Sequence, residues 1–174
     1  NYRNDQIYQK VTDLKFDNAL YSGQMINSVK EGYGTQIWPD GSAYEGYWND
    51  NQFGGLGKLR HAKGDLYEGN WLNGKANGYG IYSSLGGSKY FGNWADDKQN
   101  GMGVEVWPEG TRYEGNFVNS MKNGKGKLTF TDKSAYTGMF KDNEMHGYGV
   151  YTWSDGRKYN GNWFNSKMHG NGEI

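Results

Sequence analysis

The sequence predicts an all-β protein: an elongated, twisted, single-layer antiparallel meander, or β-solenoid, of 23-residue hairpin repeats. The first observation is a tyrosine that recurs seven times at this spacing, at Tyr21, Tyr44, Tyr67, Tyr90, Tyr113, Tyr136 and Tyr159. The second is glycine in phase with it: with each tyrosine as position 1, glycine fills positions 3, 12 and 14 of every repeat. A fixed period of about 20–50 residues indicates a repeat architecture. Such a chain builds a long surface, because each unit contacts mainly its neighbours.

The first strand of each hairpin is expected at positions 1 to 5, as in the segment Tyr-Glu-Gly-Asn-Trp that starts at Tyr67. Strict alternation of this kind is typical of a strand with one apolar face. Position 7 is Asn or Asp in every repeat, and short Asx side chains favour turns. We therefore expect the first strand to end in a turn at position 7.

The second strand is expected to begin at the Gly-x-Gly of positions 12 to 14 and to reach position 18. A second turn follows, written as Pro39-Asp40-Gly41 in one repeat and Pro108-Glu109-Gly110 in another. Proline and glycine mark turns in this way. Each repeat is thus predicted to be one β-hairpin, joined to the next by a tight turn.

Large rings are expected to form a structural spine on one face of the sheet, with glycines as slots between them. Glycine in a strand often marks the close approach of another group, and a buried ring contributes roughly 1.5–3 kcal/mol. An isolated hairpin is marginal in water, so the stacked rings would stabilise neighbouring hairpins together. The predicted spine comprises Tyr44, Trp48, Tyr67, Trp71, Tyr90, Trp94, Trp107, Tyr113, Trp153, Tyr159 and Trp163.

A row of mostly apolar side chains is expected at position 13, on the face opposite the spine. These residues would recur about 10 Å apart, because two strand spacings of about 4.8 Å separate successive repeats. The row is either covering surface or a groove for a partner, and the two readings remain open. The candidate partner-binding residues are Tyr33, Leu56, Tyr79, Met102 and Tyr148.

The domain organisation follows from the period. Residues 1–20 are expected to be a degenerate leading repeat or N-terminal cap, with Val11 to Phe16 as its second strand. The seven repeats then span residues 21–174, as 21–43, 44–66, 67–89, 90–112, 113–135, 136–158 and an incomplete 159–174. The chain starts without Met and ends inside a repeat, so we expect it to be a piece of a longer protein.

Composition excludes several classes of function. The 19 basic and 19 acidic residues cancel, which argues against nucleic acid as a partner. Cysteine is absent, so no disulfide or thiolate metal site can form. The sequence contains no run of about 18 apolar residues, which is the length that a membrane-spanning helix requires.

Catalytic residues, metal ligands and cofactors are all expected to be absent. His146 and His169 occupy equivalent positions one repeat apart, roughly 10 Å from each other. They could not share a zinc ion, whose ligands lie at about 2.1 Å. The third histidine, His61, is at position 18 of another repeat. The Gly-x-Gly pairs lie inside strands with no helix after them, so they are not phosphate-binding loops. No nucleophile, base and orienting group occur at a plausible spacing.

Direct binding to an anionic lipid is the weaker partner hypothesis. A lipid-facing surface usually carries a lysine-rich patch, and Lys75, Lys98, Lys122 and Lys167 are expected along one loop edge. Acidic residues such as Asp96, Asp142 and Glu144 are expected at the same edge and dilute the charge.

The motifs together resemble the MORN repeat (membrane occupation and recognition nexus). The resemblance rests on Tyr-Glu-Gly-Asn-Trp, Asn-Gly-Lys, Gly-Tyr-Gly and Trp-Pro-Asp-Gly, and it covers Tyr21 to Ile174. Local departures are Met25 at position 5, His61 and Ser84 at position 18, and Lys133 in place of a turn glycine.

The resemblance implies a non-catalytic structural or protein-interaction scaffold that holds a helix or extended partner segment along its sheet. The chain is similar to family members found in cytoskeletal and ciliary (axonemal) assemblies. This similarity implies a cytoplasmic location in such an assembly, where self-association is also possible. The alternative is a membrane-facing or regulatory module of a larger enzyme, such as a phosphoinositide kinase or a lysine methyltransferase.

Overall fold

The computed structural model describes residues 7–174, which form two compact units, residues 7–85 and residues 86–174. Every element in the described part of the chain is a β-strand. Residues 7–174 hold no helix with the length and apolar character of a membrane span. The expectation of an all-β chain is therefore confirmed.

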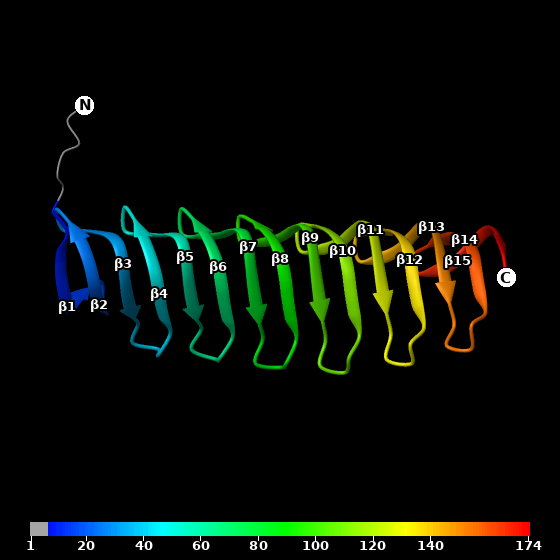
Figure 1. Ribbon diagram of the computed structural model, residues 1–174, viewed down its shortest axis with the longest axis horizontal. Coiled ribbons are helices and arrows are strands. Elements are labelled where there is room, and N and C mark those ends of the chain that lie inside the picture. The colour runs from blue at the N-terminus through cyan, green and yellow to red at the C-terminus, as the bar shows by residue number, and fades with distance from the viewer. Residues whose placement is uncertain (1–6) are drawn as a thin grey trace, which may run out of the picture. The chain divides into compact units, whose positions relative to one another are not determined.

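In the first unit the strands follow one another in chain order, each antiparallel to its neighbours (Figure 1). They are β1 (Gln9–Phe16), β2 (Ala19–Ile26), β3 (Val29–Ile37), β4 (Ala43–Asn49), β5 (Gln52–Arg60), β6 (Leu66–Leu72) and β7 (Lys75–Ser83). The strand Gln9–Phe16 includes the segment Val11 to Phe16, where the sequence suggested a strand of a degenerate leading repeat.

The second unit repeats this antiparallel meander. Its strands are β8 (Lys89–Ala95), β9 (Lys98–Val106), β10 (Arg112–Val118), β11 (Met121–Thr129), β12 (Ala135–Lys141), β13 (Glu144–Thr152), β14 (Lys158–Phe164) and β15 (Lys167–Glu173). Hairpins of the 23-residue repeat thus build both units, as the sequence predicted.

The second strand of each hairpin starts earlier than the sequence suggested, at position 9 and not at position 12. The reason is the turn: Asp50 and Asn51 have φ values of 48° and 63°. Two successive residues with positive φ form the tight two-residue turn whose twist suits a hairpin. Pairing therefore resumes at once, with Gln52 opposite Asn49.

The second turn also follows from local chemistry. In the first unit Gly41 has a φ of 87° and its N–H donates to the carbonyl of Trp38 over 3.0 Å. The carboxylate of Asp40 accepts hydrogen bonds from the backbone N–H and the hydroxyl of Ser42. Strand β3 ends at Ile37, one residue before the expected end at position 18, because Trp38 already belongs to the turn.

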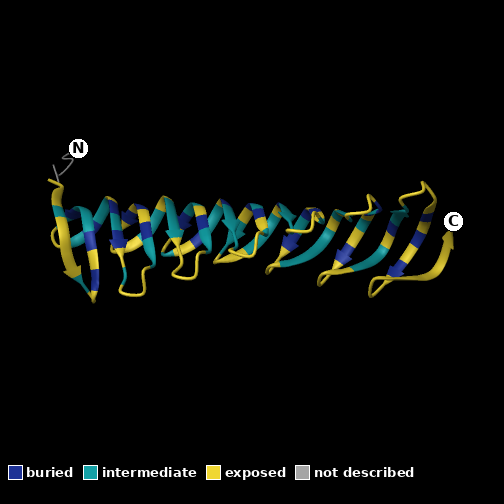
Figure 2. Cartoon of the chain, turned by 90° about the horizontal axis from the view of Figure 1, so that it is seen from below, coloured by how far each residue is buried: buried dark blue, intermediate teal, exposed yellow. Residues whose placement is uncertain are grey.

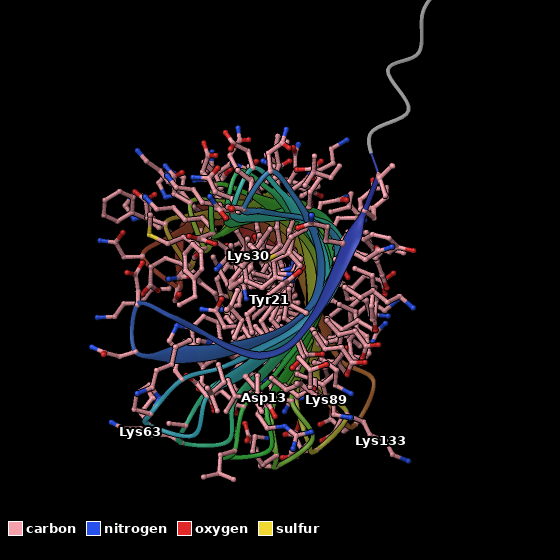
Figure 3. All side chains as sticks on the ribbon, turned by 90° about the vertical axis from the view of Figure 1, so that its left-hand side faces the viewer. Asp13, Tyr21, Lys30, Lys63, Lys89 and Lys133 are labelled. Carbon is pink, nitrogen blue, oxygen red and sulfur yellow. The ribbon has the colours of Figure 1, made fainter. Side chains whose placement is uncertain are left out.

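Buried and exposed residues alternate along the strands (Figure 2). In β4, Tyr44, Gly46 and Trp48 are buried while Glu45 and Tyr47 are exposed. We call the face that carries positions 1, 5, 10 and 16 the inner face, and the face that carries positions 2, 4, 13 and 15 the outer face. Strands of the first unit curve so that the inner face is concave, with Tyr21 on it and Asp13 outside (Figure 3).

The inner face is a stack of rings that needs glycine beneath it. Tyr44 is fully buried, and its hydroxyl donates to the carbonyl of Tyr47 over 2.8 Å. Its ring stacks on Phe53 at 3.8 Å and meets Trp48 edge-on at 5.1 Å. A Cβ at Gly57 would lie 2.0 Å from the Tyr44 hydroxyl oxygen and 2.4 Å from Cζ. The ring therefore occupies the slot that the missing side chain leaves, as the sequence suggested.

The predicted spine residues are mostly buried, with three exceptions. Trp94, Trp107 and Trp153 are only half-buried. The core also includes residues at equivalent positions that the prediction left out, namely Tyr21, Met25, Phe117, Tyr136 and Phe140. Within the second unit, Tyr113 meets Phe140 edge-on at 5.1 Å and Tyr136 meets Trp163 edge-on at 5.2 Å.

A buried lysine packs against the aromatic rings near the start of the first unit. Lys30 is 4% exposed, and its ammonium lies 4.3 Å from the ring centre of Phe16 and 4.4 Å from that of Trp48 (Figure 3). It donates to Oε1 of Gln36 over 2.6 Å. Burial lowers the pKa of the Lys30 ammonium, although the nearby Asp17 opposes this shift. The sequence analysis did not single out this cation–π site.

We expect Lys30→Met alone to be less stable than Lys30→Met combined with Gln36→Leu. The single variant leaves the buried Gln36 amide without its donor, which costs about 1–3 kcal/mol. The double variant replaces a buried charge and its partner by apolar groups, a change that is often neutral or stabilising. Both residues are native elsewhere in the array, as Met145 at position 10 and Leu59 at position 16. Denaturant unfolding compares the two variants, and equal midpoints would show that Gln36 does not depend on Lys30.

Candidate functional site

The outer face carries the row of side chains that the sequence proposed for a partner. In the first unit Tyr33, Leu56 and Tyr79 are 44%, 60% and 53% exposed, and in the second Met102 and Tyr148 are 53% and 61% exposed. They are large apolar residues on strands whose other face is already filled by the ring stack. Their exposure favours a binding surface over core.

Residues at position 4 enlarge this row, and the sequence analysis missed them. Tyr47 lies opposite Tyr33 in the sheet, and their rings meet edge-on at 5.4 Å. Met139 is the equivalent residue in the second unit and is also exposed. The signal in the sequence was weak, because position 4 is Asn in four of the seven repeats.

The register explains why position 4 joins the outer row. Alternation along β4 puts Tyr47 on the same face as Glu45, and Tyr47 pairs directly with Tyr33 of the preceding strand. Where position 4 is asparagine, its amide serves the backbone: Asn70 Nδ2 donates to the carbonyl of Tyr79 over 3.3 Å. Tyrosine or methionine at this position adds apolar surface in place of that bond.

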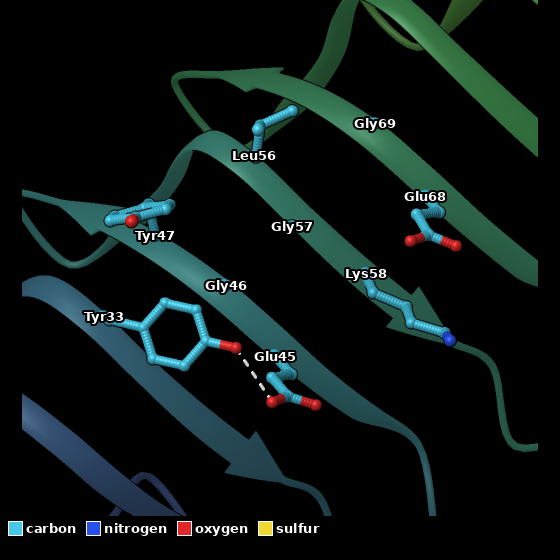
Figure 4. A pocket seen from close by; sticks show the side chains of 9 residues that line it. All are labelled: Tyr33, Glu45, Gly46, Tyr47, Leu56, Gly57, Lys58, Glu68 and Gly69. Carbon is cyan, nitrogen blue, oxygen red and sulfur yellow. Dashed lines mark hydrogen bonds between the residues drawn. The ribbon is translucent and has the colours of Figure 1, made fainter.

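Beside this row lies a hollow in the first unit, with a volume of about 350 Å³ (Figure 4). One wall is apolar, the opposite wall is charged, and the floor is glycine backbone. The apolar wall is Tyr33, Tyr47 and Leu56, the charged wall is Glu45, Lys58 and Glu68, and the floor is Gly46, Gly57 and Gly69.

The floor of this hollow is part of a row of glycines that face one another across the strands. Gly34 pairs with Gly46, Gly46 with Gly57, and Gly57 with Gly69. The charged wall follows the same register, because Glu45 pairs with Lys58 and Lys58 with Glu68. The spacing of the groups that line the hollow is therefore set by the strand register and not by the conformation of a loop.

The second unit has an equivalent hollow of about 520 Å³ on its own outer face. Its floor is again glycine backbone, at Gly115, Gly126 and Gly138. Its lining side chains are Met102, Glu114, Lys125, Lys127, Thr137, Met139 and Tyr148. This hollow has one carboxylate and two ammonium groups, so the two units differ in charge.

One electrostatic interaction fixes a wall of the first hollow. The Tyr33 hydroxyl donates to Oε1 of Glu45 over 2.8 Å across the glycine floor (Figure 4). This hydrogen bond to the carboxylate raises the pKa of the Tyr33 phenol. The bond restrains the exposed ring beside the hollow, so the aromatic wall is partly preorganised.

The structure does not bring the other candidate groups into a reactive site. His146 and His169 each lie beside the ring of Phe164, at 5.5 and 5.7 Å between ring centres. Across residues 7–174 no three His, Asp or Glu side chains are grouped as metal ligands. His61 is an exposed turn residue.

The lysine edge differs from expectation. Lys75, Lys98 and Lys167 are exposed, but Lys122 is on the inner face, with its ammonium 5.2 Å from the ring centre of Trp107. Lys122 is at position 10, the same as Lys30, whereas the other three are at position 9. Alternation along the strand therefore points Lys122 to the opposite face, and the edge has one positive charge fewer than expected.

A protein-family model described as "MORN repeat" matches seven successive segments of the chain. These are residues 21–43, 44–66, 67–89, 90–112, 113–135, 136–156 and 159–174. No curated protein sequence matches the chain.

Two solved structures are similar to this chain to different degrees. The first is the SAS-4 (dCPAP) TCP domain of Drosophila melanogaster, in complex with a proline-rich motif of Ana2 (dSTIL). It has a TM-score of 0.50 and 12% identity, with 93% of this chain and 82% of that chain covered. The second is the TCP10 domain of Danio rerio CPAP in complex with a peptide of STIL, with a TM-score of 0.45, 18% identity, and 82% and 68% covered. At these identities the likeness concerns the fold alone.

Proposed function

The chain belongs to the MORN-repeat family, and from this premise we propose that it is a non-catalytic scaffold that holds a segment of a partner protein along its outer face. The observation that carries the proposal is the exposed row of Tyr33, Leu56 and Tyr79 in the first unit, with Met102 and Tyr148 in the second. Contiguous apolar surface of this kind marks interaction sites in soluble proteins. Aromatic residues and methionine are also enriched at the centres of interfaces.

The ligand of a structural neighbour supports the proposal. The SAS-4 TCP domain was solved in complex with a proline-rich motif, which supports a peptide segment as the partner of a chain of similar fold. We extend this by analogy to the present chain, whose outer face has hollows with backbone floors in both units.

We further propose that the scaffold works in the cytoplasm, within a cytoskeletal or ciliary assembly. This part rests on the resemblance to family members of such assemblies. Charge favours a protein partner over a lipid surface, because the walls of the hollows mix carboxylates and ammonium groups. An anionic bilayer prefers clustered basic residues.

The test is site-specific photocrosslinking. We expect a benzoylphenylalanine at Leu56 or Tyr148 to yield a discrete adduct with another protein in a cell that contains the native assembly. The matched control is Leu85, an exposed leucine in a turn, which should yield no such adduct. Leu56→Ser should weaken capture by the unlabelled array without lowering its thermal stability.

Other outcomes have defined meanings. Adducts between two copies of the chain would indicate self-association as the role of this face. Binding to anionic vesicles with no protein adduct would favour the membrane-facing module. Equal adducts from Leu56 and Leu85 would overturn the outer face as the docking surface.

A further inference from the structure

We propose that the occupant of the first unit's hollow is a basic, proline-rich segment in the polyproline II conformation, lying across strands β3 to β6. This inference rests on the proposed function, because it specifies which kind of partner segment the outer face holds. Three properties of the hollow carry it: the spacing of its repeats, the chemistry of its two walls and its charge.

The spacing of the repeats matches one regular conformation of a peptide. Equivalent residues of successive repeats are two strand spacings apart, or about 9.6 Å. A polyproline II helix rises about 3.1 Å per residue with three residues per turn, so each face repeats every 9.3 Å or so. A peptide in this conformation therefore presents the same face to Glu45 and, one repeat later, to Glu68.

Other regular conformations fit less well. A β-strand turns its side chains to alternate faces, so residues three apart point in opposite directions. The two walls of the hollow are close together, because residues such as Glu45 and Tyr47 flank a single glycine of one strand. An α-helix with side chains is about 10–12 Å wide and would rest on top of these walls. The slim polyproline helix can instead reach the glycine floor.

The apolar wall suits proline rings. Tyr33 and Tyr47 present two tyrosine rings set edge-on to each other, with Leu56 continuing the wall one strand further. Grooves lined by aromatic residues are the usual receptors for such segments, because the peptide is already ordered and loses little entropy on binding. The Tyr33–Glu45 hydrogen bond reduces the entropy lost on binding further, because it holds one ring in place before the ligand binds.

The charged wall requires basic side chains in the ligand. Glu45 and Glu68 outnumber Lys58, so the three lining charges of the first hollow sum to −1. An arginine that faces Glu45 is followed, three residues later, by one that faces Glu68. Prolines on a second face of the helix contact the tyrosine wall, and the third face is left to solvent. The preferred pattern is therefore Pro-Pro-Arg repeated in phase.

The direct test measures the fluorescence anisotropy of a labelled (Pro-Pro-Arg)₃ peptide with the full chain. We expect it to bind more tightly than three matched peptides. (Pro-Pro-Glu)₃ reverses the charge, (Ala-Ala-Arg)₃ removes the proline rings, and (Pro-Pro-Pro-Arg)₃ keeps both residue types but breaks the three-residue phase. Equal binding of the three arginine peptides would show attraction by charge alone and would overturn the proposal.

Two sets of variants locate the site. Glu45→Gln with Glu68→Gln should weaken (Pro-Pro-Arg)₃ by about fivefold and reduce its salt dependence, as expected for two exposed ion pairs. Tyr47→Ser with Leu56→Ser should weaken it by about tenfold, in the range of interface hot spots. The control for the first pair is Asp96→Asn with Glu109→Gln, which removes two exposed carboxylates from turns of the second unit. An equal loss in this control would overturn the assignment to the first hollow.

Failure here is distinguishable from failure of the proposed function. If (Pro-Pro-Arg)₃ does not bind while Leu56 still crosslinks to a discrete partner, the scaffold holds a different kind of segment. If neither occurs, the outer face of the first unit is not a docking surface.

Discussion

Gly57→Val is expected to unfold the middle of the first unit, with a loss of about 3–5 kcal/mol. A Cβ at Gly57 would lie 2.0 to 2.6 Å from atoms of the Tyr44 side chain, closer than any real contact. The ring must therefore leave its slot and give up its stacking on Phe53 and its hydrogen bond to the carbonyl of Tyr47. Losing a buried aromatic side chain typically costs this amount. Guanidinium unfolding followed by tryptophan fluorescence measures it.

Gly74→Asn is the matched control, because Gly74 is a turn glycine at position 8 with open space around it. Gly74 has a φ of 76°, and the nearest atom to an added Cβ is 4.0 Å away. Asparagine tolerates this conformation, and Asn51 already adopts it at the same position. Its amide there accepts from the N–H of Lys30 over 2.8 Å, so Gly74→Asn should be neutral or stabilising. A comparable loss for both variants would refute the slot as the reason for glycine at position 14.

Period and phase made the fold predictable from the sequence. Tyrosine at position 1 and glycine at positions 3 and 14 recur without exception, which indicates a repeat array, and the strand and turn signals within one period indicate a hairpin. Strand limits were less accessible, because they depend on turn geometry. The two positive φ values at Asp50 and Asn51 allow pairing to resume three residues before the first obligatory glycine of the second strand.

The candidate site was predictable only in part. Alternation alone placed Tyr33 and Leu56 on the face opposite the ring stack. Alternation also places Tyr47 on this face, but it was missed because position 4 is asparagine in four of the seven repeats, which hides an apolar position. Lys122 was misplaced because one residue along a strand decides between a loop edge and the inner face.

Raising the pH from 10 to 12 is expected to unfold the array through its buried tyrosines. Burial raises the pKa of Tyr21 and of Tyr136 from 10.0 to about 12, and it raises the pKa of Tyr44 and Tyr113 further. The unfolded chain therefore loses these phenolic protons in this range while the folded chain keeps them. The stability contributed by the neutral phenols is complete below pH 10 and is lost as the pH rises through the folded pKa values.

The size of the effect follows from the number of phenols. Each contributes a slope of up to about 1.4 kcal/mol per pH unit, so four of them give about 5 kcal/mol per pH unit. A protein domain has only about 5–15 kcal/mol of stability. Loss of the β-sheet circular dichroism signal should therefore be one cooperative step, and the tyrosinate absorbance of the buried phenols should rise with it.

Tyr136→Phe tests whether the buried phenols cause this step. The variant gives up one hydrogen bond, from the hydroxyl to the carbonyl of Met139 over 2.8 Å, at a cost of about 1 kcal/mol at neutral pH. It also removes one titrating group, so its stability should fall less steeply above pH 10, by about 1.4 kcal/mol per pH unit. An unchanged slope, or a β-sheet circular dichroism signal that persists at pH 12, would mean that the buried tyrosines do not control alkaline stability.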